Sequence, residues 1–416
     1  MKKRGPSKAW SVPRAIVPTI AAWFRLNARP LPWREPDPAN PLARNPYHSL
    51  VSEFMLQQTQ VSRVLEKFDP FLARFPTIQS LAAAEIGDVL AEWSGLGYYR
   101  RARHLHSAAR EVVSRFGGVI PQRVEDLLTL PGIGRYTAGA IASLVHGQPA
   151  PIVDGNVMRV FLRVAGRDTP QDSPATRTWA WEQAQSLVES AANTKTCAAF
   201  NEGLMELGAR VCTPGAPRCD QCPITRQCAA FKLGLQSTIP RPKKRAVRTT
   251  ITHSSLLLIS HDGRLLVEQR PETGLWAGLW QAPTVETLGL KRPPTAAAIA
   301  RQLHLEPAHV PHRIADFIHN TTHREVKFRA WAASGLVDPD SITTTGQWLT
   351  PAQIAALGIS NPQRRILLTL GGDLATSLLC ARAPGGHHPR VQRVPVGPRR
   401  RGAGPGRPAA ATARRR

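Results

Sequence analysis

The first two hundred residues carry a helical pattern of hydrophobic positions. In segments such as 49–68 and 128–145, apolar residues recur three and four positions apart, and Gly or Pro separates one segment from the next. This spacing places the apolar side chains on one face of each helix. The pattern therefore predicts an all-helical array from about Ile16 to Val211.

The pattern changes after residue 250 from helical spacing to strand-like alternation. Residues 253–271 contain two β-rich runs around an Asp-Gly pair, which predicts a hairpin. Residues 323–333 alternate between apolar and polar side chains, as in another strand. The sequence therefore predicts a second domain of mixed α and β structure.

Segments of biased composition lie between and beyond these two patterns. The stretch that joins them contains Pro and five basic residues without apolar periodicity, which is typical of a linker. The last residues contain ten arginines and no acid, so they cannot bury enough apolar area to fold. We expect a disordered basic amino terminus at 1–15, a helical domain at 16–231, a linker at 232–250, an α+β domain at 251–381 and a disordered Arg-rich tail at 382–416.

The charge balance indicates the class of partner. The 416 residues include 54 Lys and Arg against 29 Asp and Glu, a net charge of +25, which favours a polyanion. No stretch of about 18 apolar residues occurs, and Pro13 and Pro18 interrupt the apolar run near the amino end. We expect a protein that stays in the cytoplasm and binds no membrane.

Four of the six cysteines lie in one short loop, spaced C-x6-C-x2-C-x5-C. In a reducing compartment, clustered cysteines are metal ligands more often than disulfides, and four thiolates suit zinc or a cubane cluster. Zinc knuckles usually present two C-x2-C pairs, whereas only one is present here, so the wider gaps favour an iron–sulfur cluster. Four unligated cysteines are the third alternative. The residues are Cys212, Cys219, Cys222 and Cys228.

The stretch "LPGIGRYTAGAIA", residues 130–142, predicts a helix-hairpin-helix. Gly132 and Gly134 allow a tight turn that aims backbone amides at a phosphate, at the amino end of the following helix. The alternative is an ordinary Gly-rich turn between packed helices.

Two acidic residues stand among apolar neighbours. Glu53 lies in "LVSEFMLQQTQV", where poor solvation would raise its pKa, although such an acid can also lie on a helix surface. Asp154 begins an amphipathic helix and is a candidate N-cap, a role that is compatible with chemistry. The stretch "GLGYYRRARHL" sets aromatic beside basic residues, which suits DNA binding or, alternatively, a solvated helix face with core tyrosines.

Several motifs occur in a specific order between residues 16 and 231: "LPWR", "SEFMLQQTQV", "GLGYYRRARHL", "LPGIGRYTAGAI", "VDGNV", "FNEGLMELGARVC" and the four cysteines. In this order they resemble the adenine DNA glycosylase (MutY) family of the endonuclease III superfamily. The second domain, through "EQRPETGLWAGLWQAP", resembles the C-terminal Nudix-like module of that family. The hydrolytic Nudix signature, a Gly followed by a Glu-dense helix, is not present near it, which argues against nucleotide pyrophosphatase activity.

The resemblance implies a base-excision repair enzyme with a 4Fe-4S cluster. It would act as a monomer at the nucleoid, on double-stranded DNA in which adenine is mispaired with 8-oxoguanine or guanine. Glu53 matches the acid that protonates N7 of adenine, and Asp154 matches the carboxylate that stabilises the sugar cation. Tyr136 and Asn156 match positions that support the sugar and the attacking water.

The resemblance also implies which residues contact the substrate. Gln58 and Tyr98 match residues that intercalate into the duplex, and Trp33, Arg34 and Glu202 match residues that line the adenine pocket.

Recognition of 8-oxoguanine is assigned in the family to a Phe-Ser-His loop of the second domain. Here Thr321 stands in place of the Phe and Thr322 in place of the Ser, while His323 is retained. Because a threonine hydroxyl can still form hydrogen bonds, we expect Thr322 and His323 to read the lesion without the aromatic residue.

Two other functions remain open: a bifunctional glycosylase and lyase that acts on oxidised pyrimidines, like endonuclease III, and a non-catalytic iron–sulfur DNA-binding protein. The lyase relatives carry a lysine at the position of Tyr136, and a phenol cannot form the Schiff base that a lyase needs. A non-catalytic protein would leave Glu53 and Asp154 without function. The sequence therefore favours a monofunctional adenine glycosylase.

Overall fold

The computed structural model describes residues 11–241, 248–288, 298, 300–301, 311–342 and 344–380. The predicted disordered tail, all but five residues of the predicted disordered amino terminus and six residues of the predicted linker lie outside the described residues.

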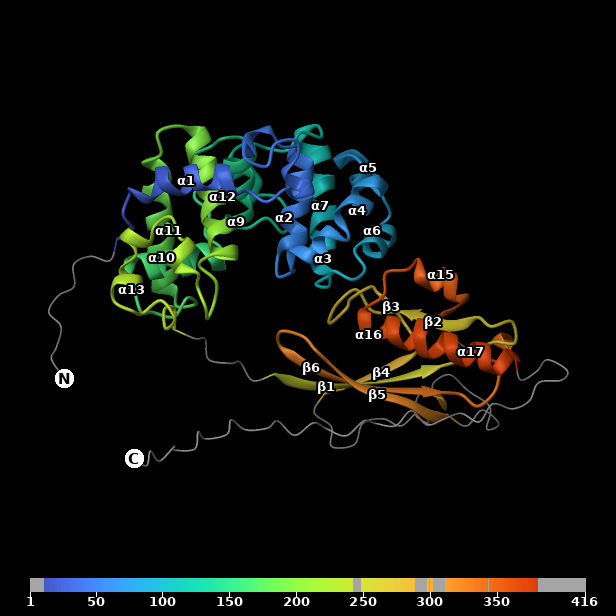
Figure 1. Ribbon diagram of the computed structural model, residues 1–416. Coiled ribbons are helices and arrows are strands. Elements are labelled where there is room, and N and C mark those ends of the chain that lie inside the picture. The colour runs from blue at the N-terminus through green and yellow to red at the C-terminus, as the bar shows by residue number, and fades with distance from the viewer. Residues whose placement is uncertain are drawn as a thin grey trace, which may run out of the picture.

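The described part of the chain from Ile16 to Lys232 is helical, as the hydrophobic pattern predicts (Figure 1). A π-helical turn over Ile141–Val145 extends α9. The helices are α1 (Ile16–Asn27), α2 (Pro46–Leu56), α3 (Val61–Leu65), α4 (Phe68–Arg74), α5 (Ile78–Ala83), α6 (Ile86–Glu92), α7 (Arg100–Phe116), α8 (Val124–Leu128), α9 (Arg135–Ala140), α10 (Gly155–Ala165), α11 (Pro174–Glu189), α12 (Thr194–Arg210) and α13 (Ala229–Lys232).

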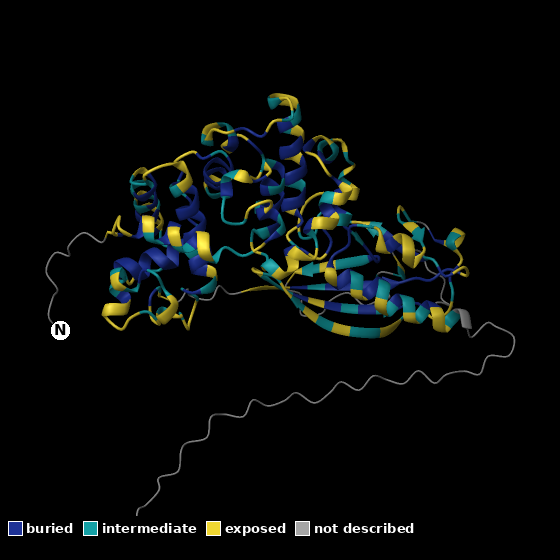
Figure 2. Ribbon diagram, turned by 45° about the horizontal axis from the view of Figure 1, so that its top comes forward, coloured by how far each residue is buried: buried dark blue, intermediate teal, exposed yellow. Residues whose placement is uncertain are grey.

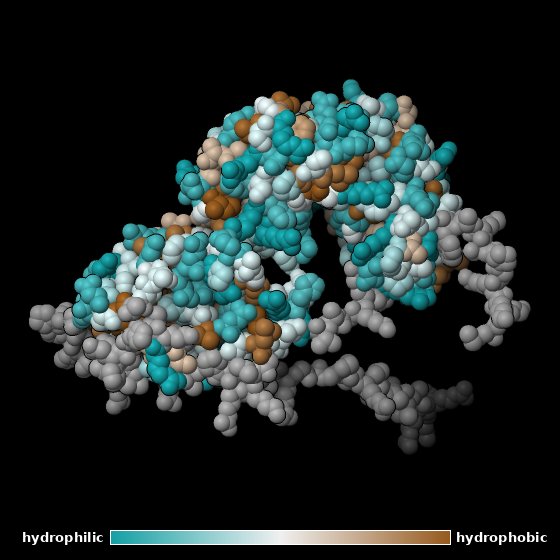
Figure 3. All heavy atoms as spheres, turned by 180° about the vertical axis from the view of Figure 1, so that it is seen from behind, coloured by the Kyte–Doolittle hydropathy of each residue, from teal (hydrophilic) through white to brown (hydrophobic). Residues whose placement is uncertain are grey.

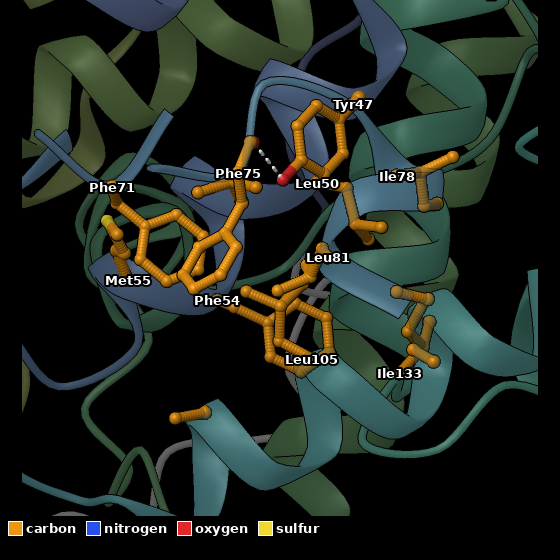
Figure 4. Packing of buried hydrophobic residues seen from close by; sticks show 14 of the residues in the cluster. Tyr47, Leu50, Phe54, Met55, Phe71, Phe75, Ile78, Leu81, Leu105 and Ile133 are labelled. Atoms are coloured by element: carbon orange, nitrogen blue, oxygen red, sulfur yellow. Dashed lines mark hydrogen bonds between the residues drawn. The ribbon is translucent and has the colours of Figure 1, made fainter. Parts of the chain in front are cut away.

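The helical domain has two separate hydrophobic cores. One is built from α2 to α9 and is rich in aromatic residues, including Phe54, Phe71 and Trp93 (Figure 4). The other joins α1 to α10, α11 and α12, so the first helix packs against elements more than a hundred residues later. Buried and exposed positions alternate along these helices (Figure 2). The helical elements of the chain thus pass from one core to the other after α1 and back again at α10, and a cavity lies where the two cores meet.

Local sequence signals fix the two helices that matter most for this cavity. Helix α2 begins with Pro46, and the side chain of Asn45 caps it by accepting from the next free amides. Helix α10 is capped by Asp154 and ends at Gly166, which adopts a left-handed conformation with φ of 66°. The bounds of both helices therefore follow from cap residues that are visible in the sequence.

The second domain contains two sheets. A four-stranded sheet has the order β4-β1-β6-β5, in which β1 and β6 are parallel, and a three-stranded sheet has the order β3-β2-β7. Helices α16 and α17 cover one face of the larger sheet (Figure 1). The elements are β1 (Thr249–Leu257), β2 (Leu265–Gln269), β3 (Trp280–Gln281), β4 (Thr284–Leu288), β5 (His312–Asn320), β6 (Arg324–Ala332), β7 (Gln347–Leu349), α15 (Pro351–Ala355), α16 (Asn361–Arg364), a π-helical turn (Arg365–Leu370) and α17 (Gly371–Cys380).

The predicted hairpin over residues 253–271 is confirmed beside its turn, but its two arms separate further along. The Asp-Gly turn forms, but β1 pairs with β4 and β6, whereas β2 pairs with β3 and β7. Next to the turn, the amide of Ser260 donates to the carbonyl of Arg264 at 2.9 Å, the amide of Leu266 donates to the carbonyl of Leu258 at 3.2 Å, and a bridge joins Ile259 and Leu265. The strands separate because each one is buried in a different sheet, and this tertiary preference outweighs the local turn signal.

The surface of the described residues is mainly hydrophilic on the face that Figure 3 presents. Within the described ranges, no helix combines the length and the apolar character needed to cross a bilayer.

Candidate active site and cysteine loop

A cavity of about 210 Å³ lies between the two cores of the helical domain. Four elements line it with one predicted site residue each: Glu53 from α2, Tyr136 from α9, Asp154 at the cap of α10 and Glu202 from α12. Trp33, Arg34 and Asn156 also line this cavity. Residues predicted from separate motifs are thus brought together in one space.

Glu53 has the perturbed titration that its apolar neighbours predicted. The pKa of its carboxyl is raised to about 7, mainly by burial and in smaller part by the nearby acids Glu202 and Asp154. The Tyr136 hydroxyl and the Arg44 guanidinium oppose this rise. A carboxyl with a pKa near neutrality exchanges its proton at working pH, as a general acid must.

Tyr136 lies against the same carboxyl. Burial raises the pKa of its phenol well above the usual value, and the charges of Glu53 and Asp154 raise it further. Its hydroxyl donates to the sulfur of Met205 at 3.3 Å. The phenol therefore stays protonated and acts as a neutral donor.

Asp154 both caps a helix and lines the cavity. Its carboxylate accepts from the amide of Val157 at 2.7 Å and from the side chain of Asn156 at 2.9 Å. Burial raises the pKa of Asp154, while these hydrogen bonds lower it. The net shift of the pKa is upward, because desolvation is the larger effect.

The side chain of Asn156, which donates to Asp154, is also held by Arg159. This buried guanidinium donates to Asn156 Oδ1 at 2.9 Å, to the carbonyl of Gly208 at 2.7 Å and to the carbonyl of Cys212 at 2.7 Å. Gly208 permits the contact between α10 and α12, since a Cβ there would lie 2.6 Å from the Cβ of Asn156. The carboxamide is therefore fixed in orientation.

A buried ion-pair network forms the wall opposite Asp154. Glu202 accepts from Arg34 Nε at 2.8 Å and from Arg44 at 2.5 Å, and each of these side chains is about 95% buried. Glu206, one turn further along α12, accepts from Arg29 at 2.6 Å and from Arg34 at 2.9 Å. Every carboxylate in this network has two arginine partners, so its position is fixed.

Sequence reasoning identified Arg34 and Glu202 but missed Arg29, Arg44 and Glu206. One signal was present, because Glu202 and Glu206 stand four residues apart and so share one face of a largely buried helix. Their arginine partners gave no such signal.

The predicted intercalating residues share an uncommon backbone conformation. Gln58 has φ of 56° and Tyr98 has φ of 48°, and both side chains are exposed. Left-handed backbone at a non-glycine residue costs free energy and often marks a functional site. Outside this pair, the structure describes positive φ at one other non-glycine residue, Trp276.

The basic stretch after Tyr98 divides between exposed and buried positions. Tyr99 is only 6% exposed, and Arg101 is buried and donates to the carbonyls of Phe54 and Met55. These two residues belong to the interior, whereas Arg100 is exposed and donates to His104 at 3.3 Å.

The loop between β5 and β6 carries Thr322 and His323, and both are exposed. Thr321 closes the loop through bonds with Arg324, and it is not part of an aromatic contact. The Thr322 hydroxyl lies 2.5 Å from the Tyr98 hydroxyl. The loop of the second domain thus touches an intercalating candidate of the first.

The turn of the predicted helix-hairpin-helix joins α8 to α9. Gly132 has φ of 75°, and a Cβ there would lie 2.5 Å from the side chain of His104. Gly134 caps α9, and both glycines are exposed while Ile133 between them is buried. The backbone amides at this turn are therefore presented to solvent from an anchored loop.

The four predicted cysteine ligands line one small cavity together with apolar residues such as Val160 and Leu207. Arg163 donates to the sulfur of Cys212 at 3.2 Å. Burial raises the pKa of the Cys222 thiol to about 11, so a cationic centre would be needed to hold it as a thiolate. Within the described residues, no cluster of three or more His, Cys, Asp or Glu is arranged to hold a single metal ion.

Two family models match the chain. Residues 51–185 match the HhH-GPD superfamily base excision DNA repair protein, and residues 255–369 match the NUDIX domain. Among solved structures, a thermostable thymine-DNA glycosylase aligns with a TM-score of 0.46 and 27% identity, over 53% of this chain and 96% of that one.

One of two curated relatives aligns along most of the chain. The adenine DNA glycosylase of Homo sapiens is 32% identical over 406 residues, which cover 85% of this chain and 74% of that one. The adenine DNA glycosylase of Mycobacterium tuberculosis (strain CDC 1551 / Oshkosh) is 41% identical over 220 residues, covering 53% of this chain and 69% of that one. With a helix-hairpin-helix glycosylase domain, a Nudix-like domain and this identity along most of its length, the chain belongs to the adenine DNA glycosylase family.

Proposed function

We propose that this glycosylase hydrolyses the N-glycosidic bond of adenine mispaired with 8-oxoguanine or guanine, and that it is monofunctional. The observation that carries the proposal is the pairing of Glu53, with a pKa of about 7, and the capped Asp154 in one cavity. Two carboxyl groups in unequal environments can divide acid catalysis from stabilisation of a cation.

The adenine must leave the helix before it can react, because the reacting atoms are not accessible in a duplex. Gln58 and Tyr98 are exposed and held in left-handed backbone, which supports their role as the side chains that fill the gap. The exposed turn of Gly132 and Gly134 supplies amides for a phosphate of the same duplex.

Adenine is a poor leaving group until it is protonated. The neutral Glu53 carboxyl donates its proton to N7 of the base, and the C1′–N9 bond then breaks with its electron pair going to the purine. The sugar is left with positive charge at C1′. The Asp154 carboxylate faces this charge, held by Val157 and Asn156, and stabilises it.

A water molecule completes the reaction by adding to C1′ and losing its proton to the Glu53 carboxylate, which restores the acid and leaves an abasic site and free adenine. Tyr136 donates from its neutral phenol beside the sugar, and the fixed Asn156 orients the water. On the opposite wall, Trp33 packs against the flipped base while the Arg34 and Glu202 pair reads its polar edge.

The absence of an amine favours the monofunctional reaction over the lyase reaction. A lyase needs an amine that attacks C1′ to form a Schiff base. No lysine is found among the described residues that line the cavity, and Tyr136 stands at the position of the lyase lysine.

We infer that a 4Fe-4S cluster is held by Cys212, Cys219, Cys222 and Cys228. The shared cavity, its apolar wall and the hydrogen bond from Arg163 to a cysteine sulfur fit such a group. When bound, the cluster would organise the loop and hold its buried cysteines as thiolates. Purified protein should be brown and contain about four irons per chain. Colourless protein with stoichiometric zinc would refute this inference.

We propose that the partner is duplex DNA that carries an adenine mispair and that the active species is a monomer; one chain supplies the residues of the proposed site. We propose that Thr322 and His323 contact the 8-oxoguanine opposite the flipped adenine. Their exposure and the contact of Thr322 with Tyr98 support this assignment.

The proposed function is tested with duplexes that carry adenine opposite 8-oxoguanine, guanine or thymine. After incubation, alkali cleaves any abasic site, and the strands are separated by size. We expect cleavage with the first two duplexes and not with the third. Strand cleavage without alkali, or a borohydride-trapped covalent complex, would indicate a lyase instead.

A further inference from the structure

The two domains of this chain meet at an apolar contact that the catalytic proposal does not use. The segment 272–279, between β2 and β3, carries Leu279, which is 1% exposed and packs into the aromatic core of the helical domain. Trp276 packs against this core and also against the core of the second domain. One loop of the second domain is therefore inserted into the first.

Hydrogen bonds from the helical domain converge on one carbonyl of the second. The hydroxyl of Tyr99 donates to the carbonyl of Ile359 at 2.8 Å, and the hydroxyl of Ser94 donates to the same oxygen at 3.3 Å. Arg364 donates to Ser94 at 3.1 Å from the second domain. Tyr99 and Ile359 are both buried, so this bond is shielded from water.

A second polar contact lies one helical turn away on α7. Arg103 donates to the carbonyl of Ala277 at 3.2 Å and forms an ion pair with Glu272 at 3.0 Å. Two glycines allow the approach, since a Cβ on Gly278 would overlap the guanidinium of Arg103, and one on Gly358 would lie 2.9 Å from the Cβ of Leu90. The backbone of the second domain is thus packed directly against α6 and α7.

The residue that precedes Tyr99 is the intercalating candidate. Tyr98 directly precedes Tyr99, its left-handed backbone fixes the direction of its side chain, and its hydroxyl meets Thr322. A rigid attachment at Tyr99 and Arg103 therefore determines how far Thr322 stands from Tyr98. Without that attachment, the exposed contact between Tyr98 and Thr322 would have to hold the loop of Thr322 against the helical domain.

We propose that Tyr99 and Arg103 are positioning residues for recognition of the base opposite adenine. They hold the second domain so that the loop of Thr322 meets Tyr98, and they thereby set the preference for 8-oxoguanine over guanine. This inference rests on the proposed function, in which that loop reads the lesion. Neither residue lines the catalytic cavity, so neither takes part in bond cleavage.

The test uses Tyr99→Phe, which removes the hydroxyl and keeps the ring. A matched control is Tyr47→Phe, because Tyr47 is also 6% exposed and donates to a backbone carbonyl, that of Phe75, at 2.8 Å (Figure 4). The control bond lies within the helical domain, whereas the Tyr99 bond joins two domains. Single-turnover excision is measured on adenine opposite 8-oxoguanine and opposite guanine.

We expect Tyr99→Phe to lower the ratio of the two rates by about three- to tenfold, the effect of losing one well-formed hydrogen bond, with the guanine rate unchanged. Arg103→Met should lower the ratio similarly, and Arg103→Lys should restore part of it, since the charge toward Glu272 is kept. Tyr47→Phe should leave the ratio unchanged. An unchanged ratio in Tyr99→Phe and Arg103→Met would overturn the proposal.

Hydrogen exchange gives a readout that does not depend on activity. In the full chain without DNA, amides in segments 272–279 and 357–360 should exchange faster in Tyr99→Phe than in wild type, and not in Tyr47→Phe. Faster exchange with an unchanged ratio of the two excision rates would show that Tyr99 holds the domains together without affecting recognition. That result would also overturn the proposal.

The double variant Thr322→Ala with His323→Ala separates this inference from the proposed function. If the double variant keeps the wild-type ratio, the reading role of the loop is wrong. If the double variant narrows the ratio while Tyr99→Phe does not, the loop reads the lesion and the positioning role is wrong.

Discussion

The catalytic cavity and the loop at residues 321–323 differ in how firmly their side chains are held. In the cavity, Glu202 and Glu206 each bind two arginines, and Asp154 accepts two hydrogen bonds. In the loop, Thr322 and His323 are exposed, and Thr322 has one contact, with Tyr98. In the proposed mechanism, chemistry is thus built on a fixed framework, whereas recognition depends on an exposed loop that contacts Tyr98 of the other domain. Changes in the cavity should therefore have large effects, and changes in the loop small ones.

The largest effect is expected from Glu53→Gln. The amide keeps the shape of the side chain but cannot supply the proton, and a general acid typically contributes about 10²- to 10⁴-fold in rate. Single-turnover excision of adenine opposite 8-oxoguanine should fall by that factor while binding to the mismatch is retained. Asp154→Asn should also lose excision. A near wild-type rate in either variant would exclude a two-carboxylate mechanism.

The next effect concerns the buried ion-pair network. Glu202→Gln leaves the buried Arg44 without its countercharge, while Arg34 keeps Glu206, and breaking a buried pair costs about 3 to 5 kcal/mol. Urea unfolding of the helical domain should report this loss. The control is Glu66→Gln, whose partner Arg63 is exposed, and which should cost less than about 1 kcal/mol. Equal losses in the two variants would mean that the network does not behave as a buried one.

The raised pKa of Glu53 makes the cavity costly for stability at high pH. A carboxyl whose folded pKa is raised stabilises the folded state below its unfolded pKa, and this contribution is lost as pH rises through the folded pKa, here about 7. Relative to wild type, Glu53→Gln should thus gain stability between about pH 4.5 and 8. A rise of the pKa to about 7 corresponds to about 3 kcal/mol. Urea unfolding of wild type and Glu53→Gln at both pH values tests this prediction. A difference in unfolding free energy between the two proteins that does not change with pH would contradict it.

The smallest effect is expected in the loop. Thr322→Ala with His323→Ala should narrow the preference for 8-oxoguanine over guanine by about a few-fold to tens-fold, since each base contact is worth about 1 to 3 kcal/mol and water can replace one. Rates on both mismatches give the result. His261→Ala, at an exposed histidine in a turn of the same domain, is the control. Full discrimination in the double variant would assign recognition to the helical domain.

Local signals in the sequence were sufficient for much of the helical domain. The helices, the Asp154 cap and the burial of Glu53 follow from spacing and neighbouring residues, and all three are found in the structure. The family resemblance then related these local features to one reaction.

Long-range pairing was not predictable in the same way. Arg44 and Glu202 are 158 positions apart, and Tyr99 and Ile359 are 260 apart, so no periodicity links them. The separation of β1 from β2 likewise depends on which sheet buries each strand. These contacts arise from tertiary packing, which a local pattern does not encode.

The pH dependence of single-turnover excision tests the central claim most directly, because the claim is that burial keeps Glu53 protonated so that it can act as the acid. The rate on adenine opposite 8-oxoguanine should be highest below neutrality and fall tenfold per pH unit above an apparent pKa near 7. The residual rate of Glu53→Gln should lack this falling limb. A wild-type rate that stays constant from pH 6 to about pH 9 would contradict the assignment of Glu53 as the acid.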